Sequence, residues 1–142
     1  MSNIKSYQRL LAVQALYEAA INKKVFDASF NEIIQHIIEN GDYKNKFNNS
    51  KLLLTKEICK GVLSNFKKID LILQNSLTNK SKLQSFDKLL LSILRCAIFE
   101  IAIKREISKK IVISEYLLIS NHFFDNREAI LLNGVLDNLR EI

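Results

Sequence analysis

The residues with reactive side chains are few in this chain of 142 residues, and they lie far apart. There are two cysteines, Cys59 and Cys96, and two histidines, His36 and His122. Neither cysteine has a second cysteine or a histidine at the spacing of a metal-binding motif. Both cysteines lie within apolar helical patterns, and free cysteines are among the residues most often buried. We therefore expect two core thiols and no metal site.

The chain also lacks the patterns that enzymes use to hold reacting groups. The three glycines, Gly41, Gly61 and Gly134, are solitary, so no glycine-rich loop is available to bind phosphates. The spacings give neither a serine–histidine–acid set nor paired acids in a polar cleft. We therefore predict a binding protein with no catalytic residue and no cofactor.

Basic residues provide the clearest indication of a partner. The chain has 21 basic and 15 acidic residues, and its net charge of +6 favours an anionic partner such as RNA or DNA. Lys5 and Arg9 lie four positions apart, hence on one face near the start of a helical pattern. Two cations there oppose the helix dipole, and a phosphate partner would explain them. Two solvated surface cations remain the alternative explanation.

Helices must position these residues, because proline is absent and 48% of the residues are hydrophobic. Apolar residues recur at three- and four-residue spacing in seven segments. These segments are residues 5–22, 26–39, 50–66, 69–77, 86–104, 109–123 and 127–140. The length is that of one domain, so we expect residues 1–142 to form a single all-α domain.

Four polar or small residues interrupt the apolar patterns. Arg95 and Glu100 lie in a segment that is apolar on almost every side, so each is expected to find a partner on another helix. Asp137 is expected to be a structural anchor and is a candidate partner for Arg95. Gly61 costs about 1 kcal/mol within a helix relative to alanine, which suggests a close helix crossing.

The sequence also predicts where the protein acts. Its apolar runs are too short to span a bilayer. The first residues, from Met1 to Lys5, lack the apolar centre of a signal peptide. A cytoplasmic location without membrane association is therefore expected.

Several short strings occur in an order and at spacings that match one protein family. They are Ala12–Tyr17, Gly61–Val62, Ile69–Asp70, Leu94–Arg95, Phe99–Ile101, Ile113 with Glu115, and Asn133–Asp137. In these strings the chain resembles the NusB family of bacterial transcription antitermination factors over nearly its full length. The resemblance implies a seven-helix all-α fold of two packed helical subdomains and a function without catalysis. It also implies binding of boxA-type single-stranded RNA, in ribosomal RNA leaders, together with the ribosomal protein NusE, within an RNA polymerase antitermination complex.

The resemblance further implies which residues contact RNA. The family's arginine-rich N-terminus is reduced here to Lys5 and Arg9, with Tyr7 available either to stack on a base or to pack in the helix face. A second RNA surface lies around the last inter-helix connection. Its residues here are Asn121, Asn126, Arg127 and Leu131. Leu131 stands where a phenylalanine is common in the family, and Phe124 replaces a family glycine.

For the protein partner, the resemblance implies contacts on two helices. Tyr17 matches a family contact position. An acidic family position appears here as Leu90, and Asp87 lies one turn earlier.

Two alternative functions are compatible with the same all-helical fold. A NusB-like domain also forms the N-terminal RNA-binding part of ribosomal RNA cytosine methyltransferases, but no nucleotide-binding sheet follows in this chain. The other alternative is a helical interaction module that self-associates, such as a homodimer that hides its RNA surface. Phe123 and Phe124 are the candidate exposed residues for such an interface.

Overall fold

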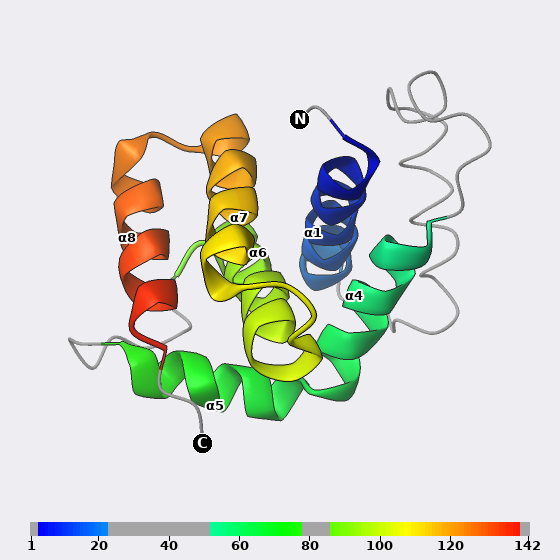
Figure 1. The fold of residues 1–142 in the computed structure, drawn as a ribbon, viewed down its shortest axis with the longest axis horizontal. Coiled ribbons are helices and arrows are strands. Elements are labelled where there is room, and N and C mark those ends of the chain that lie inside the picture. Colours follow the sequence, from blue (N-terminus) through cyan, green and yellow to red (C-terminus); the bar gives the residue numbers. More distant parts are fainter. Residues whose placement is uncertain (1–2, 23–51, 78–85, 140–142) are drawn as a thin grey trace.

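The computed structural model describes residues 3–22, 52–77 and 86–139, and these residues form helices without any strand (Figure 1). The elements are α1 (Ile4–Asn22), α4 (Leu53–Ser64), α5 (Phe66–Ser76), α6 (Lys88–Ile98), the π-helical segment η2 (Phe99–Lys104), α7 (Lys109–Phe123) and α8 (Asn126–Asp137). The all-α prediction is therefore confirmed.

Most of the predicted helices are present close to their predicted bounds. The segment predicted at 109–123 coincides with α7, whose N-terminus is capped by the Ser108 hydroxyl accepting from the Ile111 amide at 3.3 Å. The segment predicted at 86–104 divides into α6 and η2. The helix predicted at 26–39 lies outside the described residues, as do His36 and Gly41.

Helix α6 lies at the centre and packs against α1, α4, α5, α7 and α8 (Figure 1). α1 packs against α4 on one side of it, and α7 packs against α8 on the other. This arrangement agrees with two packed helical groups that share α6. The central position explains why the sequence of α6 is apolar almost all round.

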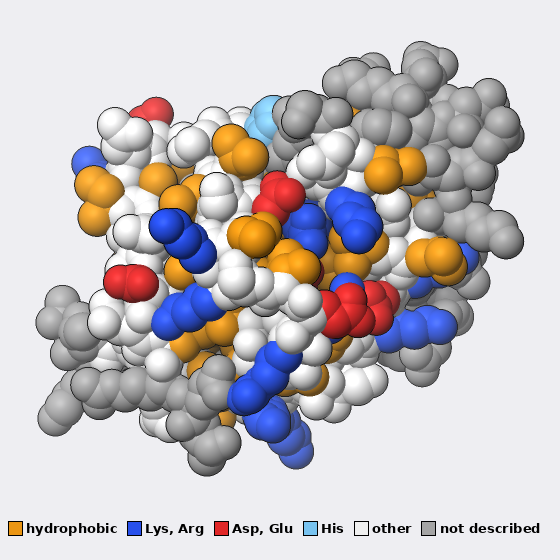
Figure 2. Space-filling view, viewed as in Figure 1, with side chains coloured by type: hydrophobic (Ala, Val, Ile, Leu, Met, Phe, Trp, Pro, Cys, Tyr) orange, Lys and Arg blue, Asp and Glu red, His pale blue; other side chains and the backbone are white. Residues whose placement is uncertain are grey.

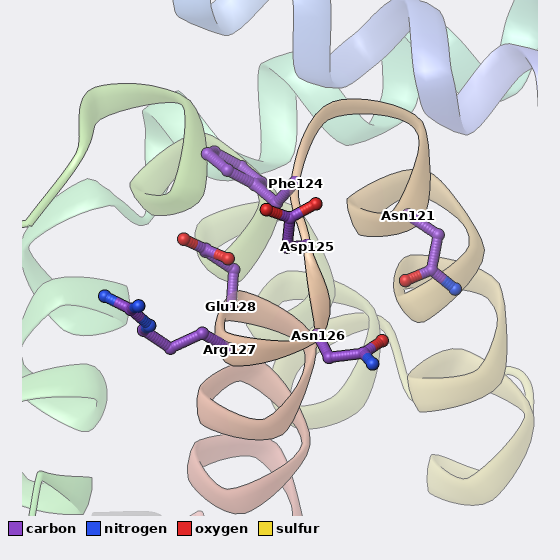
Figure 3. Close-up of a pocket in the computed structure, with 6 residues that line it drawn as sticks. All are labelled: Asn121, Phe124, Asp125, Asn126, Arg127 and Glu128. Atoms are coloured by element: carbon purple, nitrogen blue, oxygen red, sulfur yellow. The ribbon is translucent and has the colours of Figure 1, made fainter.

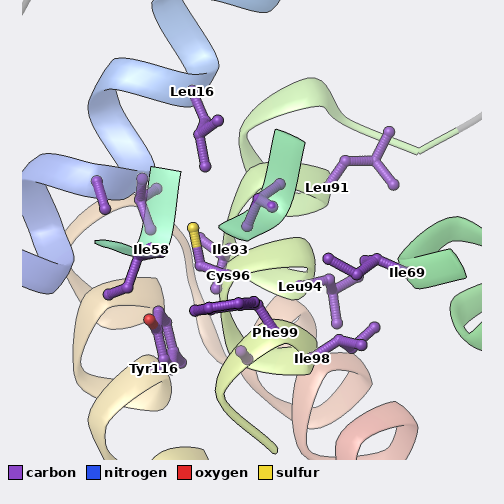
Figure 4. Packing of buried hydrophobic residues seen from close by; sticks show 14 of the residues in the cluster. Leu16, Ile58, Ile69, Leu91, Ile93, Leu94, Cys96, Ile98, Phe99 and Tyr116 are labelled. Carbon is purple, nitrogen blue, oxygen red and sulfur yellow. The ribbon is translucent and has the colours of Figure 1, made fainter. Parts of the chain in front are cut away.

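The interior is built from large aliphatic side chains around one tyrosine (Figure 4). Tyr116, Ile58, Ile93 and Leu94 are among the largest fully buried side chains. Cys59 and Cys96 are free and buried, as predicted. Burial raises the pKa of the Cys59 thiol to about 12 and also raises the pKa of Cys96, so both stay protonated at neutral pH.

Gly61 lies at a close helix crossing, as its cost within a helix suggests. A Cβ atom at this position would overlap the ring of Phe99, which belongs to η2. The absence of a side chain on α4 is therefore what allows η2 to approach it. Gly134 in α8 is different, because a Cβ there would meet nothing within 4 Å.

Arg95 finds its partner on α5. Its Nε donates to Asp70 Oδ1 at 2.8 Å and its Nη2 donates to Asp70 Oδ2 at 3.0 Å. Its guanidinium also stacks on the Phe66 ring, 4.4 Å from the centroid. The proposed pairing of Arg95 with Asp137 is wrong, because Asp137 is exposed at the end of α8 and only its backbone carbonyl is used, by Lys109.

Candidate nucleic-acid interface

The N-terminal set predicted to contact RNA divides between surface and interior. Lys5 is exposed in the first turn of α1, and Tyr7 is half-buried and packs against the core. Arg9 is only 5% exposed. Although Lys5 and Arg9 are four residues apart on one helix, only Lys5 presents its charge to solvent.

Arg9 belongs to a buried polar network that joins three helices. Its Nε and Nη2 donate to the two carboxylate oxygens of Glu100 at 2.8 and 3.1 Å. Its Nη1 donates to Glu115 Oε1 at 3.3 Å. The Tyr116 hydroxyl donates to Glu100 Oε2 at 2.6 Å, and the Ser6 hydroxyl donates to Glu115. The partner expected for Glu100 on another helix is therefore Arg9.

The electrostatics of this network favour a charged Arg9. Burial alone would lower its pKa, but the hydrogen bond and charge of Glu100 outweigh burial and raise the pKa above its ordinary value. The pKa of Tyr116 is raised, first by its own burial and then by the negative charge of Glu100. The three donor nitrogens of Arg9 point inward, so its main contacts hold α1 against η2 and α7.

The second predicted set meets at the connection between α7 and α8. Asn121, Asn126 and Arg127 line an open hollow of about 770 Å³ there (Figure 3). Leu131 does not line the hollow; it lies further along α8 with 40% of its surface exposed. The geometry thus brings together three of the four predicted residues.

Three further residues complete the lining, namely Phe124, Asp125 and Glu128. Asp125 and Glu128 were not predicted, although they flank Asn126 and Arg127 directly in the sequence. The two carboxylates outnumber the single guanidinium, so the hollow is not basic. The Glu128 Oε2 atom is buried and has no hydrogen-bond partner in the described part of the chain.

The chemistry of the hollow therefore suits a polar ligand better than a bare phosphate. Figure 3 shows the amide groups of Asn121 and Asn126 extending to one side of the connection and the Arg127 side chain to the other. Each amide can both donate and accept hydrogen bonds, as base edges and ribose hydroxyls require. Arg127 is the cation in this lining that could meet a phosphate.

The residues predicted to contact the protein partner lie at different depths. Tyr17 is half-buried on α1. Asp87 is exposed and caps α6, its Oδ1 accepting from the amides of Leu89 and Leu90 at 2.8 and 3.1 Å. Leu90 is only 4% exposed and belongs to the core. Tyr17 and Asp87 are therefore accessible to a protein partner, whereas Leu90 is not and can only support the helix from the core.

The described residues hold no group of three or more histidine, cysteine, aspartate or glutamate side chains that could bind a metal ion. Within the same ranges, no helix has the length and apolar character needed to cross a membrane. His122 is exposed beside Phe123, with 6.4 Å between the ring centroids.

The comparison with known families decides the classification. The sequence pattern of the NusB family matches residues 6–141. The chain belongs to the NusB family. Proteins named transcription antitermination protein NusB from Novosphingobium aromaticivorans and Sphingopyxis alaskensis are each 31% identical to it, over 129 and 137 residues. These alignments cover 91% and 94% of this chain and 87% and 89% of those relatives.

Solved structures of NusB share the fold. The NusB structure from T. maritima superposes with a TM-score of 0.74 at 22% identity, covering 96% of this chain and 90% of that one. A chain in a crystal structure of the antitermination factors NusB and NusE in complex with double-stranded RNA gives a TM-score of 0.78 at 18% identity. That match covers 96% of both chains, so the expected NusB-like fold is confirmed.

Proposed function

We propose that this member of the NusB family is a transcription antitermination factor that binds boxA-type RNA together with the ribosomal protein NusE. The observation that carries the proposal is the family match over residues 6–141. Relatives that are 31% identical are named as transcription antitermination proteins. A structure with the same fold contains NusB and NusE with double-stranded RNA.

The RNA surface of the proposal has two parts. One is Lys5 at the exposed start of α1, and the other is the α7–α8 connection with Asn121, Asn126 and Arg127. Leu131 adds exposed apolar surface on α8 against which a base can rest. Arg9, which is buried, and Tyr7, which is half-buried against the core, support this surface by fixing the position of α1.

The NusE surface of the proposal is centred on Tyr17 and Asp87, with Leu90 supporting it from the core. A largely apolar hollow of about 170 Å³ lies between α1, α4, α6 and the start of α5. It is lined by Leu16, Ala19, Ala20, Val62, Leu63, Phe66, Ser92 and Arg95. An apolar side chain of a protein partner would bury surface there that is now partly open to water.

In this proposal the protein is a cytoplasmic binding protein and not an enzyme. It acts as one domain over residues 1–142 within an RNA polymerase antitermination complex. Membership of the NusB family supports these statements.

The test is a titration of the purified chain with labelled boxA-type RNA at low salt, with and without NusE. We expect NusE to increase the affinity for RNA, and double-stranded RNA added as competitor shows which form is preferred. The Arg127→Gln variant should bind RNA about fivefold more weakly at 0.1 M salt, since one phosphate contact contributes a salt slope of about 0.7. Lys110→Gln, on the first turn of α7, is the control. Absence of any enhancement by NusE would contradict the proposal.

Self-association is the second candidate, and exposed apolar side chains at one end of the molecule favour it. Phe123 is 39% exposed and Ile130 is 72% exposed, on α7 and α8. Phe124 contributes less than predicted, because it packs partly against the core. Light scattering measures the molecular mass at several protein concentrations, with and without RNA. It distinguishes a dimer whose RNA surface is hidden from a monomer that binds RNA.

A further inference from the structure

The residues described so far do not explain how RNA phosphates are held. Arg9 is taken up by its buried network, and the α7–α8 hollow carries two carboxylates. Lys5 and Arg127 are the two cations placed so far at the proposed RNA surface, and they account for only part of the chain's net charge of +6. We infer that the outer faces of α4 and α5 form a second RNA-contacting surface, which holds the phosphate backbone of the strand through Lys56, Lys60, Lys67 and Lys68. This inference rests on the proposed RNA-binding function.

The helices turn these four lysines outward. The buried residues of α4 are Thr55, Ile58, Cys59 and Val62, and those of α5 are Ile69, Ile72, Leu73 and Ser76. All four lysines are exposed; Lys60 and Lys67 lie opposite the buried faces of α4 and α5, and Lys56 and Lys68 lie on their flanks. Lys56 and Lys60 are one turn apart, about 6 Å along the helix axis, which is close to the repeat of phosphates along an extended strand.

Ion pairs remove the negative charge that would otherwise balance these lysines. The acidic residues of α4 and α5 are Glu57 and Asp70. Lys104 Nζ lies 2.6 Å from Glu57 Oε1, and Arg95 Nε lies 2.8 Å from Asp70 Oδ1. Arg95 of the central helix thus matches Asp70, whereas Lys104 of η2 is shared between Glu57 and Glu106, whose Oε2 lies 3.4 Å from its Nζ. The four outer lysines form no salt bridge within the described residues.

The shape of the molecule gives the lysines a continuous path. α4 and α5 follow each other along the lower right and lower edge of Figure 1, with Asn65 between them. Their 12 and 11 residues give a path of about 35 Å. Figure 2 shows Lys and Arg side chains at the lower middle and right of the same view, and others over its left and centre. Leu53 and Leu71 are also exposed on these helices and offer apolar contacts to bases.

The experiment measures RNA affinity from 0.05 to 0.5 M salt for two double variants of the full chain, Lys56→Gln/Lys60→Gln and Lys67→Gln/Lys68→Gln. Glutamine keeps the helix propensity and removes only charge. Each double variant should lower the salt slope by about 1.4 and weaken binding about 25-fold at 0.1 M salt, since each phosphate contact contributes about 0.7. The control is Lys88→Gln/Lys110→Gln, which removes two exposed lysines from other helices and should change the slope by less than half as much.

Each outcome has one meaning. If the control loses as much affinity as the two double variants, the effect is one of total charge and the inference is wrong. If RNA binding is unchanged while NusE binding falls, the surface contacts the protein partner and the inference is also wrong. If the unaltered chain binds no RNA with or without NusE, the proposed function itself fails.

Discussion

At the scale of single residues, the contrast between Lys5 and Arg9 shows how tertiary contacts decide the role of a cation. The two residues share a helix face, but only Arg9 lies opposite Glu100 and Glu115. Removing one member of a buried ion pair destabilises the protein, because the remaining charge keeps its desolvation penalty without its partner. The sequence spacing predicted one face correctly, but it carried no information about which helices would cover that face.

The Glu100→Gln variant should destabilise the protein by about 3 kcal/mol, because it removes the two-oxygen partner of the buried Arg9 guanidinium and leaves only the 3.3 Å contact with Glu115. Equilibrium unfolding in urea measures this loss. The matched control is Glu106→Gln, whose side chain is 65% exposed and contacts Lys104 at 3.4 Å. The control should change the free energy of unfolding by less than about 0.5 kcal/mol. Equal losses of unfolding free energy in both variants would show that the buried pair contributes no more to stability than the exposed one.

The Asp125→Asn variant should bind RNA about two- to fivefold more tightly at low salt, because it removes a negative charge from the α7–α8 hollow. The backbone at the helix start should be unaffected, since the Asp125 side chain makes no capping hydrogen bond to α8. Anisotropy titrations at low and high salt measure the change, which should shrink as salt is added. Asp137→Asn, at the other end of α8, is the control. A loss of affinity in Asp125→Asn would mean that this carboxylate binds the ligand.

At the scale of elements, the change from α6 to η2 is the feature that sequence patterns did not reveal. The apolar pattern keeps its helical spacing from residue 86 to 104, so it predicts one helix. In the structure, the π-helical turn places Phe99 against Gly61 and Glu100 against Arg9. Local propensity does not encode such a change, because both contacts come from helices distant in the sequence. The start of α7, in contrast, was predicted correctly at residue 109, and a local contact marks it, since the Ser108 hydroxyl accepts from the Ile111 amide.

The two helical glycines should respond in opposite ways to alanine. Gly61→Ala should destabilise the protein by about 1–3 kcal/mol, because the new methyl group overlaps the Phe99 ring. Gly134→Ala should stabilise it by about 0.5–1 kcal/mol, because the site is open and alanine is the better helix former. Thermal and urea unfolding of the two variants provide the measurement. Destabilisation of Gly134→Ala would contradict the open environment described for α8.

At the scale of the whole molecule, the residues that maintain the fold and those that meet solvent are clearly separated. The family strings include Asp70, Arg95, Glu100, Gly61 and Glu115, and the structure places these residues in ion pairs, hydrogen bonds and the close crossing. The resemblance therefore predicted the fold well. It did not indicate all the residues that line the α7–α8 hollow, because Asp125 and Glu128 lie in none of those strings.

The stability of the whole molecule should fall as the pH rises above about 9. The Cys59 thiol has a pKa of about 12 when folded and an ordinary value of 9.0, so the unfolded chain loses this proton first. The folded state then binds more protons than the unfolded state, and stability falls by roughly 1.4 kcal/mol per pH unit for this thiol. Urea unfolding between pH 8 and 11 measures the slope. Cys59→Ala should be less stable at pH 8 but should show a shallower slope, and an unchanged slope would contradict the assignment.

The pairing of Arg9 with Glu100 has a consequence for evolution. Loss of Arg9 alone leaves Glu100 charged inside the protein, and loss of Glu100 alone leaves Arg9 with only Glu115 as a charged partner, so selection should remove such chains before a second change can compensate. Across homologous sequences, the two alignment columns should therefore vary jointly, with both members retained or both replaced by neutral residues.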